Sequence, residues 1–283
     1  MSTVKQALEN ARARLQDRVD SSSLDSQILL ADTLGVDRAW LYAHADELLE
    51  PTAMAKFENA IQRREAGEPV AYITGVREFW SLPFKVTPAT LIPRPETEHL
   101  VEFILDLRHL PQQPRVLDFG TGSGAIAIAL AHEKPTWKIT AVDISEQALA
   151  VAEQNALLNK VKTIRFLSGD GFSPVSNERF DIIASNPPYV PEKDPHLGQG
   201  DVRYEPSQAL VSGPDGLDCI RYLGKHAKDY LVDHGCLILE HGYDQGQAVR
   251  ALFDEYGYSD ITTTCDLNQQ ERLTSAYWNN RNG

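Results

Sequence analysis

The sequence predicts an α/β fold in which a mostly parallel seven-stranded sheet is covered by helices on both faces and carries an antiparallel strand near its C-terminal end. From residue 115 onward, short apolar segments of strand character alternate with segments of helical periodicity, which is typical of a parallel sheet. Strands are expected at residues 115–119, 138–142, 163–167, 180–184, 236–240, 261–265 and 273–278. The last two are joined by a polar loop, so we expect them to pair antiparallel. Helices are expected at residues 125–132, 146–158, 217–232 and 244–256.

The N-terminal part is expected to form a small helical bundle. Apolar residues recur at helical spacing from Val4 to Leu15, and further helices are expected from about residue 24 to Gly35, around residues 40–49, where Pro51 would end the helix, and at residues 52–65. Residues 70–74 and 78–86 are rich in aromatic and β-branched residues, and Gly75 separates them. They predict a hairpin.

Two prolines around Arg94 predict an extended segment after this hairpin, because a residue before proline avoids the helical region. A helix is expected to follow at residues 96–107. We therefore expect three parts: a helical domain at residues 1–70, a hairpin and proline-rich linker at 71–95, and the sheet domain at 96–283.

Composition excludes several classes of protein. The 283 residues include 40 acidic and 27 basic side chains, for a net charge of −13, which argues against a protein held to nucleic acid by bulk electrostatics. No apolar run approaches the roughly 18 residues that a membrane span needs, and the charged N-terminal residues predict no secretory signal. The three cysteines fit neither a disulfide framework nor a zinc site. We expect a cytoplasmic enzyme or binding protein without a metal.

A glycine-rich turn lies between the first expected strand of the sheet and its first helix. Gly120, Gly122 and Gly124 would let a ligand approach the backbone, and free amides at a helix N-terminus favour a negative group. Asp143 ends the next strand, where its carboxylate can accept hydrogen bonds from both ribose hydroxyls. Asp118 can hold the turn or meet an ammonium group. These residues predict a nucleoside-cofactor site, with a purely structural turn and a dinucleotide site as the alternatives.

The segment Asn186-Pro187-Pro188-Tyr189 follows a buried strand and provides the second signal. The Asn186 side chain and the Pro187 carbonyl can accept two hydrogen bonds from a planar NH₂ group, and Tyr189 can stack on its plane. Such contacts localise the nitrogen lone pair, so methyl transfer from a sulfonium would need positioning and local electrostatics rather than a strong base. The alternative is a plain turn with a buried tyrosine.

Together these motifs resemble the HemK/PrmC family, the glutamine N(5)-methyltransferases of peptide chain release factors. The resemblance covers nearly the whole chain and rests on residues 91–98 (LIPRPETE), 118–124 (DFGTGSG), 186–189 (NPPY), 205–206, 209–210, 215–217 (DGL) and 239–242 (LEHG). The PRPETE stretch combined with NPPY is specific to this family. NPPY alone also occurs in DNA adenine methyltransferases and other amino methyltransferases.

The resemblance implies a class I (Rossmann-like) methyltransferase that uses S-adenosyl-L-methionine and releases S-adenosyl-L-homocysteine. The substrate would be the glutamine amide nitrogen in the Gly-Gly-Gln loop of class I release factors, which supports translation termination. We expect a monomer whose N-terminal helices grip the release factor.

The resemblance also implies which residues form the site. The expected cofactor residues are Asp118, Gly120, Thr121, Gly122, Ser123, Gly124, Asp143, Asp170, Gly171, Phe172 and Asn186. The expected catalytic residues are Asn186, Pro187 and Tyr189, which bind the substrate together with Pro188. Similar proteins often carry a bulky aromatic residue where this chain has Gly171, so we expect Phe172 to stack on the adenine while Asp170 meets its amine.

Three competing functions fit the motifs less well. An adenine amino methyltransferase would have to hold a polyanion, but residues 1–90 contain 13 acidic and 10 basic residues and offer no basic clamp. A nicotinamide dehydrogenase would leave the NPPY segment without a purpose. A non-catalytic binding module would not need the intact glycines, Asp143 and Asn186. Glutamine methylation is preferred, with adenine methylation in DNA or RNA as the alternative.

Overall fold

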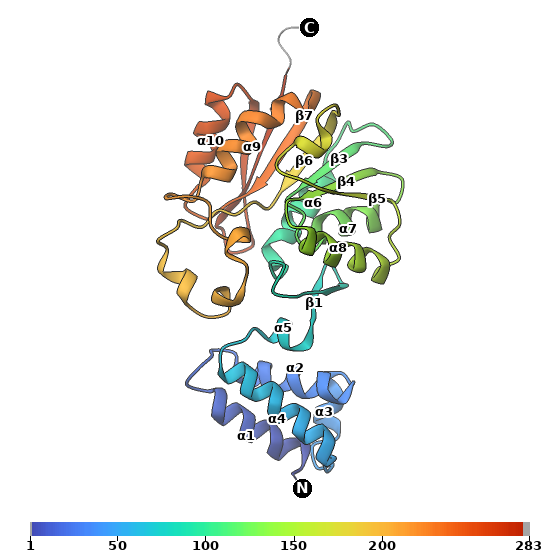
Figure 1. Cartoon of the computed structure of the whole chain (residues 1–283), viewed down its shortest axis with the longest axis vertical. Coiled ribbons are helices and arrows are strands. Elements are labelled where there is room, and N and C mark those ends of the chain that lie inside the picture. The colour runs from blue at the N-terminus through green and yellow to red at the C-terminus, as the bar shows by residue number, and fades with distance from the viewer. Residues whose placement is uncertain (1, 280–283) are drawn as a thin grey trace. The chain divides into compact units, whose positions relative to one another are not determined.

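A computed structural model describes residues 2–279 of the chain, and Figure 1 shows the course of its helices and strands. The chain divides into two compact units. The first extends to Val76 and also includes Pro195–Tyr204. The second comprises Arg77–Asp194 and the chain from Glu205 onward. Among the described residues, no helix combines the length and apolar character needed to cross a membrane.

The first unit is a bundle of short helices. Its helices are α1 (Val4–Leu15), α2 (Ser22–Leu34), α3 (Arg38–Ala43), α4 (Pro51–Glu65) and α5 (Val70–Thr74). A capping box between Thr3 and Gln6 starts α1, and Gly35 ends α2 in a left-handed conformation with φ 67°. The predicted bundle is therefore present, but α3 is shorter than the prediction. Pro51 does not end that helix; it is the first residue of α4, a position that suits proline because no N–H is needed there.

The predicted strand at residues 70–74 is wrong, because these residues form α5. Val70 and Ile73 pack against the core of the bundle, and this packing overrides their intrinsic preference for strands. Gly75 ends the helix with φ 74°. The hairpin lies further along the chain, with strands β1 (Val76–Phe79) and β2 (Leu82–Lys85).

The segment Pro195–Tyr204 is held to the helices by polar contacts. The buried Arg64 side chain pairs with Asp25 and with Asp201, each at 2.7 Å, and the Tyr204 hydroxyl donates a 2.6 Å hydrogen bond to the Ala66 carbonyl. Sequence patterns had assigned this segment to the sheet domain. They could not reveal its actual unit, because the contacts join residues that are far apart in the chain.

The second unit confirms the predicted α/β fold. Its sheet has the strand order β5-β4-β3-β6-β7-β9-β8, in which β9 runs antiparallel to both neighbours. The strands are β3 (Arg115–Phe119), β4 (Lys138–Asp143), β5 (Ile164–Ser168), β6 (Phe180–Ser185), β7 (Leu231–Glu240), β8 (Ser259–Cys265) and β9 (Glu271–Trp278). The α-helices are α6 (Glu98–Asp106), α7 (Ala125–Glu133), α8 (Glu146–Leu158), α9 (Asp218–His226) and α10 (Gly246–Glu255).

Short 3₁₀ turns complete both units. They are η1 (Pro95–Thr97), η2 (Ser173–Val175), η3 (Pro195–Gly198), η4 (Val202–Tyr204), η5 (Ser207–Ala209) and η6 (Ala227–Asp229). The helix predicted at residues 217–232 is too long at its C-terminal end. It stops at His226, and Leu231 already pairs with Phe180 of β6. Pairing in the sheet therefore replaces the last predicted turn of this helix.

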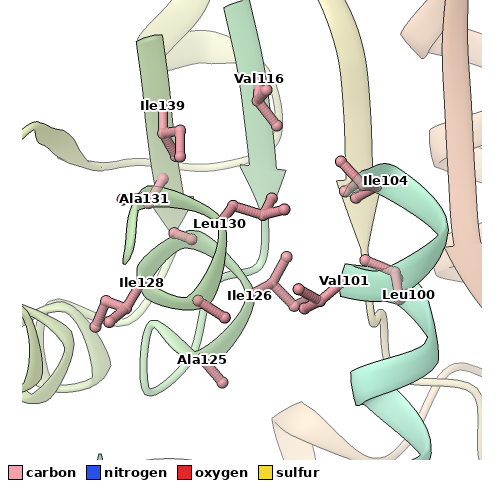
Figure 2. Packing of buried hydrophobic residues seen from close by; sticks show 14 of the residues in the cluster. Leu100, Val101, Ile104, Val116, Ala125, Ile126, Ile128, Leu130, Ala131 and Ile139 are labelled. Carbon is pink, nitrogen blue, oxygen red and sulfur yellow. The ribbon is translucent and has the colours of Figure 1, made fainter. Parts of the chain in front are cut away.

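Alternate residues of the central strands face two buried layers. On β3, Val116 belongs to the cluster packed with α6 and α7, whereas Leu117 belongs to the cluster packed with α9 and α10. Figure 2 shows the first layer, in which Leu100 and Val101 of α6 face Ile126 of α7. Since both faces are buried, the sheet is a rigid frame, and ligands of such sheets bind beyond the carboxyl ends of the strands.

Candidate active site

A cavity of about 530 Å³ lies in the second unit, at the carboxyl ends of β3, β4 and β6. It brings together most of the predicted site residues. Those that line it are Gly120, Thr121, Gly122, Ser123, Asp143, Asp170, Gly171, Asn186, Pro187 and Pro188. The predicted residues outside the lining are Asp118, Gly124, Phe172 and Tyr189. Two signals that are far apart in the sequence thus meet in one site.

Two glycines of the turn have different physical roles. Gly122 has φ 56°, a left-handed conformation that disfavours other residues, and a Cβ placed there would meet no atom within 4 Å. At Gly124, a Cβ would lie 2.9 Å from the Ile128 side chain and 3.1 Å from the Ala152 Cβ. Gly122 therefore shapes the wall of the cavity, while Gly124 permits the close packing of α7 on α8.

Asp143 connects the end of β4 to the glycine turn. One carboxylate oxygen accepts a 2.8 Å hydrogen bond from the Gly122 amide, and the other accepts a 2.9 Å bond from the Ser145 amide. Burial raises the pKa of Asp143, while these amides oppose the rise. Because a carboxylate oxygen accepts more than one hydrogen bond, both oxygens keep capacity for a ligand in the cavity.

Asp118 lies behind the turn rather than in the cavity. The residue is fully buried, and its Oδ2 accepts hydrogen bonds from the Thr121 hydroxyl at 2.6 Å and the Ala127 amide at 3.1 Å. Burial raises the pKa of Asp118 to about 7. Of the two roles that the sequence left open, the geometry supports holding the turn over meeting an ammonium group.

Two aromatic residues line the cavity, Phe119 of β3 and Tyr222 of α9, whereas Phe172, which was expected to stack on the adenine, is not part of the lining. The Phe172 ring is buried and stacks on Tyr230 with ring centroids 4.4 Å apart, directly behind the two lining rings, at 4.9 Å from Phe119 and 6.0 Å from Tyr222. Tyr222 of α9 lines the cavity and is 40% exposed. A Cβ built on Gly171 would lie 2.0 Å from the Tyr222 hydroxyl. Tyr222 therefore occupies the space beside Gly171, which sequence reasoning missed because α9 lies far along the chain.

The loop after β6 is held by a chain of hydrogen bonds. Asn186 Nδ2 donates to the Thr97 hydroxyl at 2.9 Å, and that hydroxyl donates to Glu240 Oε2 at 2.7 Å. The Tyr189 hydroxyl donates to Glu240 Oε1 at 3.2 Å. Tyr189 was expected to stack on the substrate amide. Its hydroxyl bonds to Glu240, and the residue is outside the cavity lining.

Electrostatics keep Tyr189 a neutral donor. Burial and the neighbouring Glu240 both raise the pKa of Tyr189. Glu240 is 1% exposed, and burial raises its pKa to about 6, while hydrogen bonds from Thr97 and Tyr189 and the charge of Arg272 oppose the rise. The carboxylate is therefore the common acceptor behind the loop.

The backbone of the same loop is fixed by Gln245 and by Gly216, which lies in the 215–217 motif. Gln245 Nε2 donates a 3.0 Å hydrogen bond to the Tyr189 carbonyl. A Cβ on Gly216 would lie 2.3 Å from that carbonyl oxygen, so only glycine fits there. Thr97, Gly216 and Glu240 lie in motifs of the family resemblance, which assigns them no role. Their contacts show that they hold the loop after β6.

A buried ion pair holds the proline-rich wall. Arg94 lines the cavity and donates a 2.5 Å hydrogen bond to Glu205, whose carboxylate is buried. Glu205 also accepts a 3.3 Å hydrogen bond from the Ile92 amide. This pair fastens the extended segment around Pro93 to the loop that precedes η5.

The fold and the site define a class I methyltransferase. In line with this, the structure is similar to a methyltransferase from Pyrococcus furiosus, with a TM-score of 0.54 and 18% identity over 78% of this chain and 99% of that chain. The Methyltransferase small domain family matches residues 100–200, and the PrmC N-terminal domain family matches residues 6–75.

Two relatives narrow the class. The chain is 47% identical to the release factor glutamine methyltransferase of Vibrio cholerae, over 96% of each chain. It is 46% identical to the protein of the same name from Escherichia coli, over 94% of this chain and 96% of the relative. The chain belongs to the release factor glutamine methyltransferase family.

Proposed function

We propose that this chain transfers a methyl group from S-adenosyl-L-methionine to the side-chain amide nitrogen of the glutamine in the Gly-Gly-Gln loop of class I release factors. The observation that carries the proposal is that the glycine turn with Asp143 and the loop with Asn186 line the same cavity. The names of the similar proteins support the substrate class. A release factor substrate also implies that the enzyme works in the cytoplasm.

The cavity residues fit the cofactor. A volume of about 530 Å³ lies in the range of small-molecule sites. Asp143 keeps acceptor capacity for a ribose, and the space beside the Gly122 Cα is open. Tyr222 and Asp170 would meet the adenine, while the turn residues would hold the amino-acid end. When bound, S-adenosylmethionine supplies an electrophilic methyl group.

The remaining work is positioning, and Asn186 is its centre. The Asn186 Nδ2 group is occupied by Thr97, so its Oδ1 is the acceptor available to an amide N–H of the substrate. Pro187 and Pro188 form the adjacent wall. An acceptor placed there orients the amide nitrogen and disfavours delocalisation of its lone pair, and the proton can leave to solvent after transfer. Tyr189 acts indirectly, by fixing the loop.

The direct test offers labelled S-adenosylmethionine to three candidate substrates. These are unmodified release factor, release factor with the loop glutamine changed to alanine, and duplex or single-stranded DNA. We expect label on the unmodified release factor alone. Label on DNA would contradict the proposed substrate and favour adenine methylation. Label on the alanine variant would show that a residue other than the loop glutamine is methylated.

We also propose that residues 1–70 form a helical substrate-recognition domain, that residues 71–95, which begin within α5 and contain the β1–β2 hairpin, form the linker, and that residues 96–283 form the methyltransferase domain, apart from Pro195–Tyr204, which packs with the helices. Tyr42 is 68% exposed on the helical unit, and exposed tyrosines often anchor protein interfaces. Tyr42→Ser should raise the KM for release factor about tenfold, while turnover of a Gly-Gly-Gln peptide stays unchanged. Tyr243, 60% exposed in the second unit, provides the matched Tyr→Ser control. Equal KM values in both variants would contradict this role.

We propose a monomeric enzyme. Light scattering at assay concentrations should give the mass of one chain, 31.5 kDa. A mass of two chains would contradict this expectation.

A further inference from the structure

We propose that Thr97 and Glu240 are positioning residues that fix the orientation of the Asn186 side-chain amide, with its oxygen presented to the methyl-accepting nitrogen. The inference rests on the proposed function and adds the residues that make Asn186 competent. Asn186 can orient a substrate N–H only if its oxygen, not its NH₂ group, faces the cavity. An amide that rotates by half a turn would offer a donor where an acceptor is needed.

The direction of the hydrogen bonds settles this orientation. A threonine hydroxyl has one proton, and Thr97 donates it to Glu240 Oε2 at 2.7 Å. The Thr97 oxygen can then only accept, so the partner at 2.9 Å must be the NH₂ group of Asn186. The oxygen of Asn186 is left as the free end of the amide, and Asn186 lines the cavity.

The second oxygen of Glu240 makes the arrangement unambiguous. This oxygen accepts a 3.2 Å hydrogen bond from the Tyr189 hydroxyl. An ionised Glu240 therefore has a donor at each carboxylate oxygen and no proton to donate. Thr97 and Glu240 are both buried, which strengthens these bonds by excluding water. Neither residue was assigned a role by the sequence patterns, although both lie in family motifs.

The charged groups around Glu240 determine the pH range in which the Thr97 and Glu240 hydrogen bonds hold the Asn186 amide. Arg272 favours the ionised form and Glu96 opposes it, while the Thr97 and Tyr189 hydroxyls stabilise the carboxylate. Burial lowers the pKa of the adjacent His241. Burial leaves the pKa of Glu240 at about 6. Above that pH the carboxylate accepts hydrogen bonds from both hydroxyls. Below it, Glu240 carries a proton that it can donate to Thr97, and the Thr97 hydroxyl can then turn toward Asn186.

The first test uses variants at Thr97. Thr97→Val removes the hydroxyl at nearly constant volume and should lower kcat about 100-fold, the scale of a misplaced reacting group, while the calorimetric Kd for S-adenosylhomocysteine is unchanged. Thr97→Ser keeps the hydroxyl and should restore most of the rate. Thr140→Val, another buried threonine on β4, is the matched control. A Thr97→Val enzyme as fast as this control would overturn the proposal.

The second variant supplies a pH signature. Glu240→Gln carries both a donor and an acceptor, so one of its two partners must reverse. Its kcat should be lower and constant through the region where the unaltered enzyme loses activity, around and below pH 6. If kcat of the glutamine variant still falls at low pH, the role of Glu240 is contradicted, because a glutamine side chain does not titrate and cannot cause that fall.

The last test needs no activity and so separates this inference from the proposed substrate. In the ligand-free protein, the side-chain NH₂ resonances of ¹⁵N-labelled Asn186 should shift with pH, with a midpoint near 6. The shift should be absent in Glu240→Gln. If release factor proves not to be the substrate, this titration still tests whether Glu240 and Thr97 orient Asn186. A resonance that is independent of pH in the unaltered protein would refute that role.

Discussion

The two halves of the cavity are stabilised in different ways, although a buried carboxylate lies behind each. Asp118 holds the glycine turn of the cofactor half through Thr121 and Ala127, which are 3 and 9 residues away in the sequence. Glu240 holds the substrate half through Thr97 and Tyr189, which are 143 and 51 residues away. The glycine turn of the cofactor half is therefore held from within one continuous stretch of chain, whereas the loop of the substrate half is held only after distant segments have packed.

This difference predicts that substitutions can separate cofactor binding from methyl transfer. The largest effect is expected at Asn186, where the substrate half meets the reacting nitrogen. Asn186→Ala should lower kcat by about 10²–10³-fold, the scale for one lost orienting hydrogen bond in an active site, with little change in the Kd for S-adenosylhomocysteine. Asn268→Ala in the loop between β8 and β9 is the control. Turnover equal to that of this control would remove Asn186 from the mechanism.

In the cofactor half, Asp143 should give the converse result. Asp143→Ala should weaken cofactor binding by about 1.5–3 kcal/mol, the contribution of a hydrogen bond to a charged group, because the variant loses the ribose acceptor and frees the Gly122 amide. Asp143→Asn keeps one acceptor oxygen, so its Kd should lie between those of Asp143→Ala and the unaltered chain. Isothermal calorimetry measures both, and a Kd unaffected by either change would exclude Asp143 from the cofactor site.

The same half offers a test of the aromatic wall. Tyr222→Ala should weaken cofactor binding by about 1–3 kcal/mol, the range for a base stacked on an aromatic side chain, while Tyr222→Phe should bind normally. Tyr243→Ala, at another exposed tyrosine, controls for the loss of a surface ring. If Tyr222→Ala binds as tightly as the control, the adenine lies against another surface.

The smallest effect concerns stability and compares the two carboxylates. The pKa of Asp118 is raised to about 7 by burial, so folding becomes less favourable as pH rises from the unfolded pKa through the folded one. Asp118→Asn cannot ionise, and its advantage should grow over this interval. We expect its Tm to exceed that of the unaltered chain by about 2–4 °C at pH 8, with the gap closing near pH 4. A constant gap would show that Asp118 does not titrate there.

The same contrast explains what the sequence could predict. The strand, glycine turn and Asp143 of the cofactor half follow one another along the chain, so local patterns located them. The sequence pointed to Phe172 for adenine stacking because it is the neighbour of Gly171, whereas Tyr222 of α9 lies far along the chain. The contact of the Tyr189 hydroxyl could not be predicted, since the Glu240 carboxylate that accepts its hydrogen bond comes from β7. Packing likewise turned the predicted strand at Val70–Thr74 into a helix.

The most direct test of the central claim is a crystal structure of the chain with S-adenosylhomocysteine and a class I release factor. It should show the ribose at Asp143, the adenine against Tyr222, and the loop glutamine with its amide nitrogen at Asn186, all in the one cavity. A glutamine bound away from Asn186, or a cofactor bound away from the glycine turn, would contradict a single site with two separately held halves.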